Sequence, residues 1–556
     1  MNKIKFNRSS FVTKLLPFLL LFLIFSGTKF TGDDDIYTQI NENMDIFGRV
    51  YKEIALDYVD EIYPDKFMKA GIDGMLNTLD PYTTYIDASR KDEVDLLTTG
   101  KYGGIGITVG QKDSDIVITE VMEGYSAQRQ GLKVGDKILE VDGIQMNGKN
   151  ASDIRTFVKG PTGSTVKMKI ERNGQQLDFV LTREEINLKN VTYKGFIDDG
   201  IGYIKLERFT RNAESEMADA INELKSKGEI KGIVLDLRDN PGGLLDAAIG
   251  ILNKFVDKGS LLLTTRGRKQ DSERKYFSSQ DPMIGKDVPL VLLVNQNTAS
   301  ASEIVSGAIQ DLDRGVVVGT RTFGKGLVQV FTPLSYDNQL KITTQKYFTP
   351  SGRWIQSKNY FKENKYGVFK PDPYMNQTEF KTLHGRTVYP EGGITPDSSV
   401  ASSKDNELLD QLDNQDMFQK FAEKYVTDNP DGNAFVWNDD MYNSFYNFLK
   451  DQQFNYTSNT ESELMKLKSM IDNKNYSDKA KEYVSQLDTE IKSEYLRDFD
   501  DSKLQIKDHL EVEILKNYNK PRKDITALSF KDDPQLQTAL NIVKNSGLYN
   551  VLLTAK

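Results

Sequence analysis

The stretch NTASASEIVSGAIQD, residues 297–311, places three hydroxyl side chains within five residues: Thr298, Ser300 and Ser302. A hydroxyl at the start of a helix could attack a carbonyl carbon, because the free N–H groups and the positive end of the helix dipole stabilise an oxyanion. The same letters also fit a plain helix cap, in which Ser300 and Glu303 form a capping box ahead of an apolar helical pattern. The stretch alone favours the cap and does not say which hydroxyl would react.

Few side chains could accept the proton of such a hydroxyl, because the chain has no Cys and only two His, His384 and His509. Thiol nucleophiles and Cys-ligated metals are excluded, and neither His lies in a HExxH context. Lys325 stands between two glycines in GTRTFGKGLVQV, and Gln329 follows four residues later. A lysine can serve as a base when burial lowers its pKa, and Ser–Lys pairs are a known variant of triad chemistry. The alternative is that Lys325 is an ordinary solvated loop lysine. If Lys325 is the base, Gln329 could orient its amine.

A third stretch, LDLRDNPGGLLD, contains Gly242 and Gly243 between a strand pattern and a helix pattern. These glycines could simply form a tight turn. They could also direct a backbone N–H at an oxyanion, together with the N–H of Ala301. A single oxyanion donor typically lowers the barrier by roughly 3–4 kcal/mol.

The elements that must hold these residues alternate between strand and helix over residues 190–400. The runs KGIVLDLRD, VPLVLLVNQ and RGVVVGTR predict buried strands, with helices between them. This pattern indicates βαβ units and a largely parallel sheet. Such sheets gather their working loops at the carboxyl ends of the strands, so residues 240–243, 298–302 and 322–326 are expected on one edge.

The rest of the chain predicts further domains, which agrees with its 556 residues. Residues 36–95 have a helical pattern that LDPYTTYID interrupts, and residues 96–185 show short strands and hairpins with one or two helices. Residues 401–556 are polar and helical, without a motif that carries chemistry. We therefore predict a multidomain α/β protein: a parallel-sheet βαβ core, an inserted β-rich module, and a helical region at each end.

The three loops together resemble the carboxyl-terminal processing peptidases, also called tail-specific proteases. The stretches KITTQKYFTPSGRWIQ and PEGGITPD add to this resemblance, which covers about residues 36–400. In that family the nucleophile stands 25 residues before the lysine and a Gln stands four after it; Ser300, Lys325 and Gln329 have this spacing. The resemblance therefore selects Ser300 among the three hydroxyls. It implies a Ser/Lys dyad, an oxyanion site at Ala301 and Gly242 or Gly243, and no cofactor or metal.

The β-rich module resembles PDZ domains in the stretch Gly104, Ile105, Gly106 and Ile107 and in SAQRQGLKVGDKILEVDG. Ser126 stands where that family often has Pro, which affects one turn. Successive backbone N–H groups in such a loop form a nest for a carboxylate, and the peptide adds to a sheet edge. The resemblance implies that Gly104–Ile107 bind the C-terminal tail of a peptide or protein substrate.

The first 30 residues resemble a secretory signal, with basic residues, an apolar run from Leu15 to Phe25, and then small residues. The run is short for a membrane span, so both cleavage and retention as an anchor stay open. We expect a location in the periplasm or cell envelope. The net charge of −9 gives no reason to expect a nucleic-acid partner. Gating, adaptor binding and homo-oligomer assembly are open roles for residues 401–556.

The expected function is an exported serine endopeptidase that recognises C-terminal tails. A PDZ scaffold with a degenerate protease domain is the main alternative, and the intact Ser, Lys and Gln argue against it. A Ser-Lys acylase of the β-lactamase type requires S-x-x-K. Residue 303 is Glu, so this second alternative fails on spacing.

Overall fold

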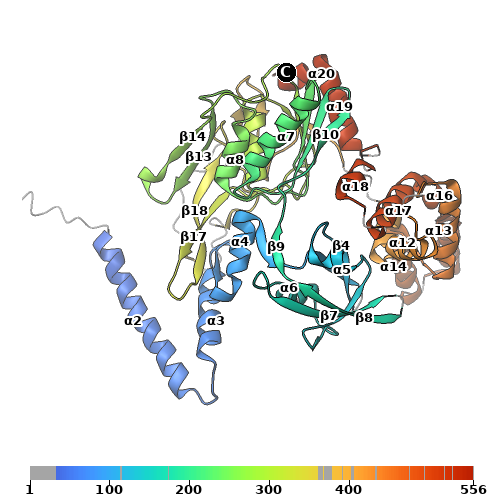
Figure 1. The fold of residues 1–556 in the computed structure, drawn as a ribbon, viewed down its shortest axis with the longest axis horizontal. Helices are drawn as coiled ribbons and strands as arrows, with labels where there is room; N and C mark the ends of the chain where they lie inside the picture. The colour runs from blue at the N-terminus through green and yellow to red at the C-terminus, as the bar shows by residue number, and fades with distance from the viewer. Residues whose placement is uncertain are drawn as a thin grey trace, which may run out of the picture. The chain divides into compact units, whose positions relative to one another are not determined.

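The computed structural model describes residues 33–554 apart from residues 113–114, 173, 361–366, 369–378, 391, 402–405, 433–434, 475, 494, 519, 529 and 532 (Figure 1). It divides into two compact units, residues 1–81 and residues 82–556. The predicted signal segment, residues 1–30, lies outside the described residues. Within the described part of the chain, no helix has the length and hydropathy needed to cross a membrane.

The first unit contains two helices, α2 (Asp33–Asp57) and α3 (Pro64–Leu76). Tyr51 joins them, because its ring stacks on Phe67 at 5.7 Å between centroids and its hydroxyl donates to the Pro64 carbonyl at 2.9 Å. Of the region predicted as helical, residues 36–95, the first unit holds these two helices and ends at residue 81. Helix α3 ends before the predicted break, where β1 (Thr84–Ile86) begins the second unit as a strand.

The β-rich module predicted at residues 96–185 is present. Its sheet has the order β3-β4-β5-β7-β8, so β3 is an edge strand. Ile154 and Val158 of helix α6 pack in the module's core, where they join Ile105 and Ile107. The elements of this region are α4 (Lys91–Thr99), β2 (Lys101–Gly104), β3 (Ile107–Lys112), β4 (Asp115–Val121), α5 (Ser126–Gln130), β5 (Lys137–Val141), β6 (Ile144–Gln145), α6 (Ala151–Val158), β7 (Thr165–Arg172), β8 (Gln175–Thr182) and β9 (Glu184–Asn187).

The central sheet of the second unit has the order β10-β11-β12-β15-β16-β21. All neighbours from β11 onward are parallel, and β10 is the antiparallel edge. Strands β12, β15 and β16 are buried along their whole length, as the apolar runs predicted. The strands are β10 (Val191–Asp198), β11 (Ile201–Leu206), β12 (Gly232–Asp236), β15 (Leu290–Val294), β16 (Val316–Gly319) and β21 (Ser398–Ser399).

Three helices cover one face of this sheet: α7 (Ala213–Lys227), α8 (Leu245–Leu252) and α9 (Ala301–Asp311). Every residue of α9 is buried. A helix enclosed on all sides holds its first turn in one position, which matters because Ser300 immediately precedes it.

The Lys325 loop leads into a second sheet, which is antiparallel. It consists of β1 with β13 (Leu261–Gly267), β14 (Arg274–Phe277), β17 (Leu327–Pro333) and β18 (Gln339–Phe348). Strand β17 begins two residues after Lys325 and pairs along its length with β18. The hairpin therefore fixes one end of the loop, while β16 of the central sheet fixes the other. A short ribbon, β19 (Phe380–Lys381) and β20 (Thr387–Val388), follows.

The helical C-terminal region has two parts that pack on different surfaces. Figure 1 shows α12, α13, α14, α16 and α17 gathered in one bundle, whereas α19 and α20 (red) lie at the central sheet beside β10. The bundle has its own aromatic core, in which the ring of Phe445 contacts those of Phe418 and Phe421. The helices are α11 (Glu407–Asn414), α12 (Met417–Asp428), α13 (Asp439–Asp451), α14 (Asn459–Asn473), α15 (Asp478–Ser493), α16 (Tyr495–Asp501), α17 (Lys503–Asn517), α18 (Arg522–Leu528), α19 (Pro534–Lys544) and α20 (Ser546–Leu553).

The last two helices cover the second face of the central sheet. Leu536, Ala539 and Val543 of α19 join a buried cluster with residues of β12, β15 and β16. An ion pair of 2.6 Å between Arg238 and Asp533 reinforces this contact directly after β12. A segment predicted only as an extension is thus a structural layer over the central sheet.

Leu536→Ala is expected to lower the free energy of unfolding by about 2–5 kcal/mol, because Leu536 is fully buried between α19 and the sheet. Leu504→Ala is the matched control, since Leu504 is 67% exposed, and its expected change lies within about 0.5 kcal/mol. Chemical denaturation measures both. Equal stabilities of the two variants would contradict a structural role for α19.

Candidate functional site

Ser300 has an unusual backbone conformation at the N-cap of α9. Its φ is 55° and its ψ is −114°, a region that residues other than glycine rarely occupy and that costs about 1–3 kcal/mol. The surroundings hold this turn: the Ala299 N–H donates to the Asn240 carbonyl at 3.0 Å, and the Tyr347 hydroxyl donates to the Ser300 carbonyl at 3.3 Å. Such strain is commonly kept where a side chain must be presented to a substrate.

The other two hydroxyls of the stretch have structural partners. Thr298 is fully buried, and its hydroxyl donates to the Leu237 carbonyl at 2.9 Å. Ser302 is also fully buried, and its hydroxyl donates to the Asn240 carbonyl at 3.0 Å. Ser300 is partly exposed. The geometry therefore favours Ser300 as the accessible hydroxyl, the same residue that the family spacing selects.

A buried carboxylate, Glu303, ties the Ser300 turn to the Lys325 loop. Its Oε2 accepts from the backbone N–H groups of Ser300 and Lys325, both at 2.8 Å. Its Oε1 accepts from the Gly324 N–H at 2.7 Å and from the Thr322 hydroxyl at 2.5 Å. The bond from Ser300 is the carboxylate half of the predicted capping box. The other three bonds, which connect two distant loops, were not predicted from the sequence.

Burial raises the pKa of Glu303 to about 7, and its hydrogen bonds with Thr322, Lys325, Gly324 and Ser300 oppose that rise. Only the ionised carboxylate can accept from four donors at once. Near neutral pH the site therefore depends on a carboxylate that is close to its titration point.

Close packing explains the two glycines beside Lys325. A Cβ atom at Gly324 would lie 2.7 Å from the Cβ of Ser357, and one at Gly326 would lie 2.7 Å from Nε1 of Trp354. The Lys325 side chain is partly buried, and its ammonium lies 4.4 Å from the ring centroid of Tyr82. Tyr82 was not predicted as a site residue, and only its place in LDPYTTYID could have pointed to it.

Gln329 lies on β17, opposite Thr343 of β18. Its side-chain amide donates to the Thr343 hydroxyl at 3.1 Å. The observed bond therefore holds Gln329 to the neighbouring strand, and the orientation of Lys325 by Gln329 stays a prediction.

The glycine pair lies against the Ser300 turn. A Cβ atom at Gly242 would lie 2.6 Å from the Ala299 carbonyl oxygen and 2.9 Å from the Ser300 Cβ, so no other residue fits without displacing that turn. The Gly242 N–H donates to the Asn240 side-chain oxygen at 2.9 Å. Among the described residues, the N–H groups of Gly243 and Ala301 have no acceptor. Of the two glycines, Gly243 thus has the N–H that is available to an oxyanion.

The two histidines lie in other contacts. His384 is 3.6 Å from Asp313, and the ring of His509 is 5.0 Å from that of Phe418. Across the residues that the structure describes, no group of three or more His, Asp or Glu side chains could hold a metal ion.

The predicted tail-binding stretch, Gly104–Ile107, leads into the edge strand β3 and lines a groove. Gly106 has a φ of +84°, and a Cβ atom there would lie 2.5 Å from that of Tyr125. The N–H groups of Ile105 and Gly106 have no acceptor in the described part of the chain. Two such donors at the start of an unpaired strand edge suit a peptide that ends in a carboxylate.

Four family models match the chain. They are peptidase family S41 at residues 200–365, a PDZ domain at 93–171, the N-terminal domain of the activating protease CtpB at 26–90, and the C-terminal helical domain of a probable PDZ-protease at 408–543. The last model covers a region in which we found no motif.

Curated relatives match over most of their length. The chain is 37% identical over 315 residues to a carboxy-terminal-processing protease of Bartonella bacilliformis, which covers 56% of this chain and 72% of the relative. It is 31% identical over 387 residues to a probable CtpA-like serine protease of Staphylococcus aureus, with 69% and 75% covered.

Solved structures also match, at low TM-scores. A photosystem II D1 C-terminal processing protease is 27% identical, covering 63% of this chain and 85% of its own, with a TM-score of 0.36. The PDZ domain of a carboxy-terminal protease from Vibrio cholerae, solved with a peptide, is 26% identical, covering 16% and 99%, with a TM-score of 0.15. The family assignment therefore depends on the sequence matches.

Proposed function

The chain belongs to the carboxyl-terminal processing peptidases of family S41, which are serine-type peptidases, and from this premise we propose that Ser300 and Lys325 form its catalytic dyad. The observation that carries the proposal is the Glu303 carboxylate, which accepts hydrogen bonds from the backbone of both residues. Two loops that lie more than 20 residues apart in the sequence are thereby held together around one partly exposed hydroxyl.

In the proposed reaction, the Ser300 hydroxyl oxygen attacks the scissile carbonyl carbon while the neutral amine of Lys325 accepts its proton. The N–H groups of Ala301 and Gly243 donate to the oxyanion of the tetrahedral intermediate. The intermediate then collapses, the peptide C–N bond breaks, and Lys325 returns the proton to the leaving amine. Water attacks the resulting ester by the same steps in reverse and releases Ser300. Gln329 is proposed to orient Lys325 when a substrate is bound.

The PDZ domain is proposed to bind the substrate's C-terminal tail through Gly104–Ile107. The free N–H groups of Ile105 and Gly106 support a carboxylate there, and the edge strand β3 supports pairing with the tail. Cleavage would then take place upstream of the bound tail, in the chain that reaches Ser300.

Amidation of a substrate's C-terminus is expected to weaken its binding about ten- to a hundredfold, because a hydrogen bond to a charged partner contributes roughly 1.5–3 kcal/mol. The test compares KM and kcat for a long peptide with a free acid and for the same peptide as an amide. A peptide too short to reach the PDZ domain is the control, since its cleavage should not respond to amidation. Equal KM values for the two long peptides would contradict tail recognition.

We also propose that the protein is exported, with residues 1–30 as a signal or an anchor and its folded part in the periplasm or cell envelope. A fusion of residues 1–60 to alkaline phosphatase is expected to be active, because that reporter folds only outside the cytoplasm. Removal of residues 1–30 from the fusion is the control and should abolish the signal. Strong activity from a cytoplasm-dependent reporter on the same segment would contradict export.

A further inference from the structure

The groove along the edge strand β3 has walls from three parts of the chain. It has a volume of about 1400 Å³, large enough for several residues of an extended peptide. The PDZ domain supplies the Gly104–Ile107 stretch, and the protease core supplies Glu207 and Arg208. The helical C-terminal region supplies the remaining wall, with Lys516 at the end of α17, Lys520, Pro521 and Ile525.

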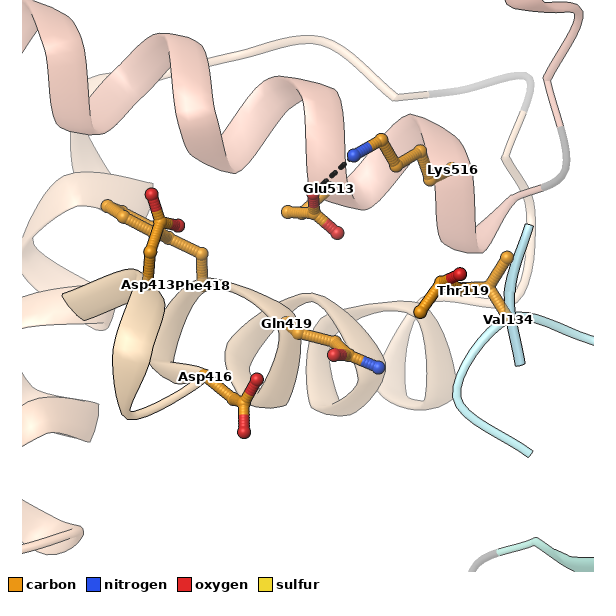
Figure 2. Close-up of a pocket in the computed structure, with 8 residues that line it drawn as sticks. All are labelled: Thr119, Val134, Asp413, Asp416, Phe418, Gln419, Glu513 and Lys516. Carbon is orange, nitrogen blue, oxygen red and sulfur yellow. Dashed lines mark hydrogen bonds and ion pairs between the residues drawn. The ribbon is translucent and has the colours of Figure 1, made fainter. Parts of the chain in front are cut away.

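The wall from the helical C-terminal region lies next to the PDZ domain. Figure 2 shows a small cavity of about 200 Å³, with Thr119 and Val134 of the PDZ domain on one side and α12 and α17 on the other. Lys516 lies there with its ammonium 2.6 Å from Glu513. Thr119, Val134 and Lys516 line both the cavity and the groove, so the end of α17 lies beside the tail-binding surface.

The position of Lys516 relative to a bound tail follows from the strand pairing. Thr119 of β4 lies between the partners of Thr108 and Val109 of β3, and a strand rises about 3.3 Å per residue. A tail whose carboxylate reaches Gly104–Ile107 would run past Thr108 and Val109 with the residues that precede its end. Along the strand direction, Lys516 is therefore expected at the level of those residues and not at the level of the carboxylate.

More basic than acidic side chains line the groove, although the whole chain has a net charge of −9. Five basic side chains line it against three acidic ones: Lys159, Lys189, Arg208, Lys516 and Lys520 against Glu120, Glu123 and Glu207. Two of the five cations come from the helical C-terminal region. Pairing with a strand edge does not depend on the peptide's sequence, so side chains on the opposite wall are the ones that can discriminate.

We propose that Lys516, Lys520, Pro521 and Ile525 form the third wall of the tail-binding groove and select substrate tails with Asp or Glu shortly before a free C-terminal carboxylate. This inference depends on the proposed tail recognition and specifies the substrate class for it. Lys516 and Lys520 attract the acidic side chains, while Pro521 and Ile525 contact apolar ones.

The test uses the full-length protein with Ser300→Ala, so that bound peptides stay intact. Fluorescence anisotropy measures the Kd of a labelled peptide that ends in a free acid and has two Asp residues among the four that precede its C-terminal residue. The same peptide with Asn in place of both Asp residues is measured beside it. The Asp peptide is expected to bind about three- to tenfold more tightly at low salt, and less so at high salt, since each exposed ion pair contributes roughly 0.2–1 kcal/mol. The double variant Lys516→Glu/Lys520→Glu should remove or invert this preference.

The matched control is Lys466→Glu/Lys474→Glu, at one residue of α14 and at its C-cap. Lys466 pairs with Glu463 at 2.7 Å, in the same spacing as Lys516 with Glu513, but lies outside the groove. The control should keep the preference for Asp and the Tm of the double variant. Equal Kd values for the Asp and Asn peptides, or a preference that survives the Lys516/Lys520 reversal, would overturn the inference. An amidated Asp peptide that binds as tightly as the free acid would instead overturn the proposed tail recognition.

Discussion

Ser300→Ala is expected to lower kcat for peptide hydrolysis by about 10⁶-fold, the order found when a nucleophile that acts together with its base is removed. Lys325→Arg should be nearly as severe, because the guanidinium of Arg stays protonated and cannot accept the Ser300 proton. Since the two residues would act as one unit, the double variant should be no worse than either single variant. Single-turnover hydrolysis of a fluorogenic peptide measures all three.

The controls for this prediction are the neighbouring hydroxyl and the two histidines. Ser302→Ala removes one buried hydrogen bond to the Asn240 carbonyl, so it should cost roughly 1 kcal/mol of stability and leave kcat within about tenfold. His384→Ala and His509→Ala should keep most of the activity, because both rings lie in contacts away from Ser300. Robust turnover by Lys325→Arg, or a loss in a His variant equal to that in Ser300→Ala, would rule out the dyad.

Glu303→Gln is expected to lower kcat by about 10²-fold or more, although Glu303 touches no reacting atom. An amide cannot accept on both sides, so its NH₂ group would face either the N–H groups of Ser300 and Lys325 or the Gly324 N–H and the Thr322 hydroxyl. Either arrangement pushes the two loops apart, and a shift of about 1 Å in a catalytic group can cost a hundredfold.

The matched control is Glu216→Gln. Glu216 of α7 also accepts from backbone N–H groups, those of Asn190 and Val191 at 2.7 and 3.0 Å, but these donors lie at the start of β10 and not at the Ser300 turn. Both variants should lose stability, as unsatisfied buried donors cost about 1–3 kcal/mol each. Only Glu303→Gln should also have a lower kcat per molecule of folded protein. Equal kcat values for the two variants would contradict a positioning role.

The same carboxylate predicts opposite pH dependences for stability and for activity. Because burial raises the pKa of Glu303 to about 7, the folded state holds its proton more tightly than the unfolded state. Its contribution to stability is therefore fully present below about pH 4 and is lost as the pH rises through about 7, on the order of 3 kcal/mol in total. Activity should rise over the same range, since only the ionised form accepts from all four donors. Both effects are measured by comparing wild type with Glu303→Gln, once for the free energy of unfolding against pH and once for kcat against pH.

The parts of the fold that depend on local pattern could be predicted from the sequence. The apolar runs identify β12, β15 and β16, and the family spacing selects Ser300 and Lys325. The second role of Glu303 could not be predicted, because it arises only where the Ser300 turn meets the Lys325 loop. Likewise, no local signal distinguishes α19, which covers the central sheet, from the helices of the bundle, since both have ordinary amphipathic patterns. The choice between Gly242 and Gly243 required the hydrogen bond to Asn240.

The position of α19 has a consequence for the order in which the molecule is made. More than 200 residues separate the end of β16 at Gly319 from the start of α19 at Pro534. At a synthesis rate of about 5–20 residues per second, the ribosome needs roughly 10–40 s to cover that distance. During this time the strands already made have an apolar face without its covering helix. Both faces of the central sheet can therefore be covered only after α19 has left the ribosome, long after the loops that carry Ser300 and Lys325 have been made.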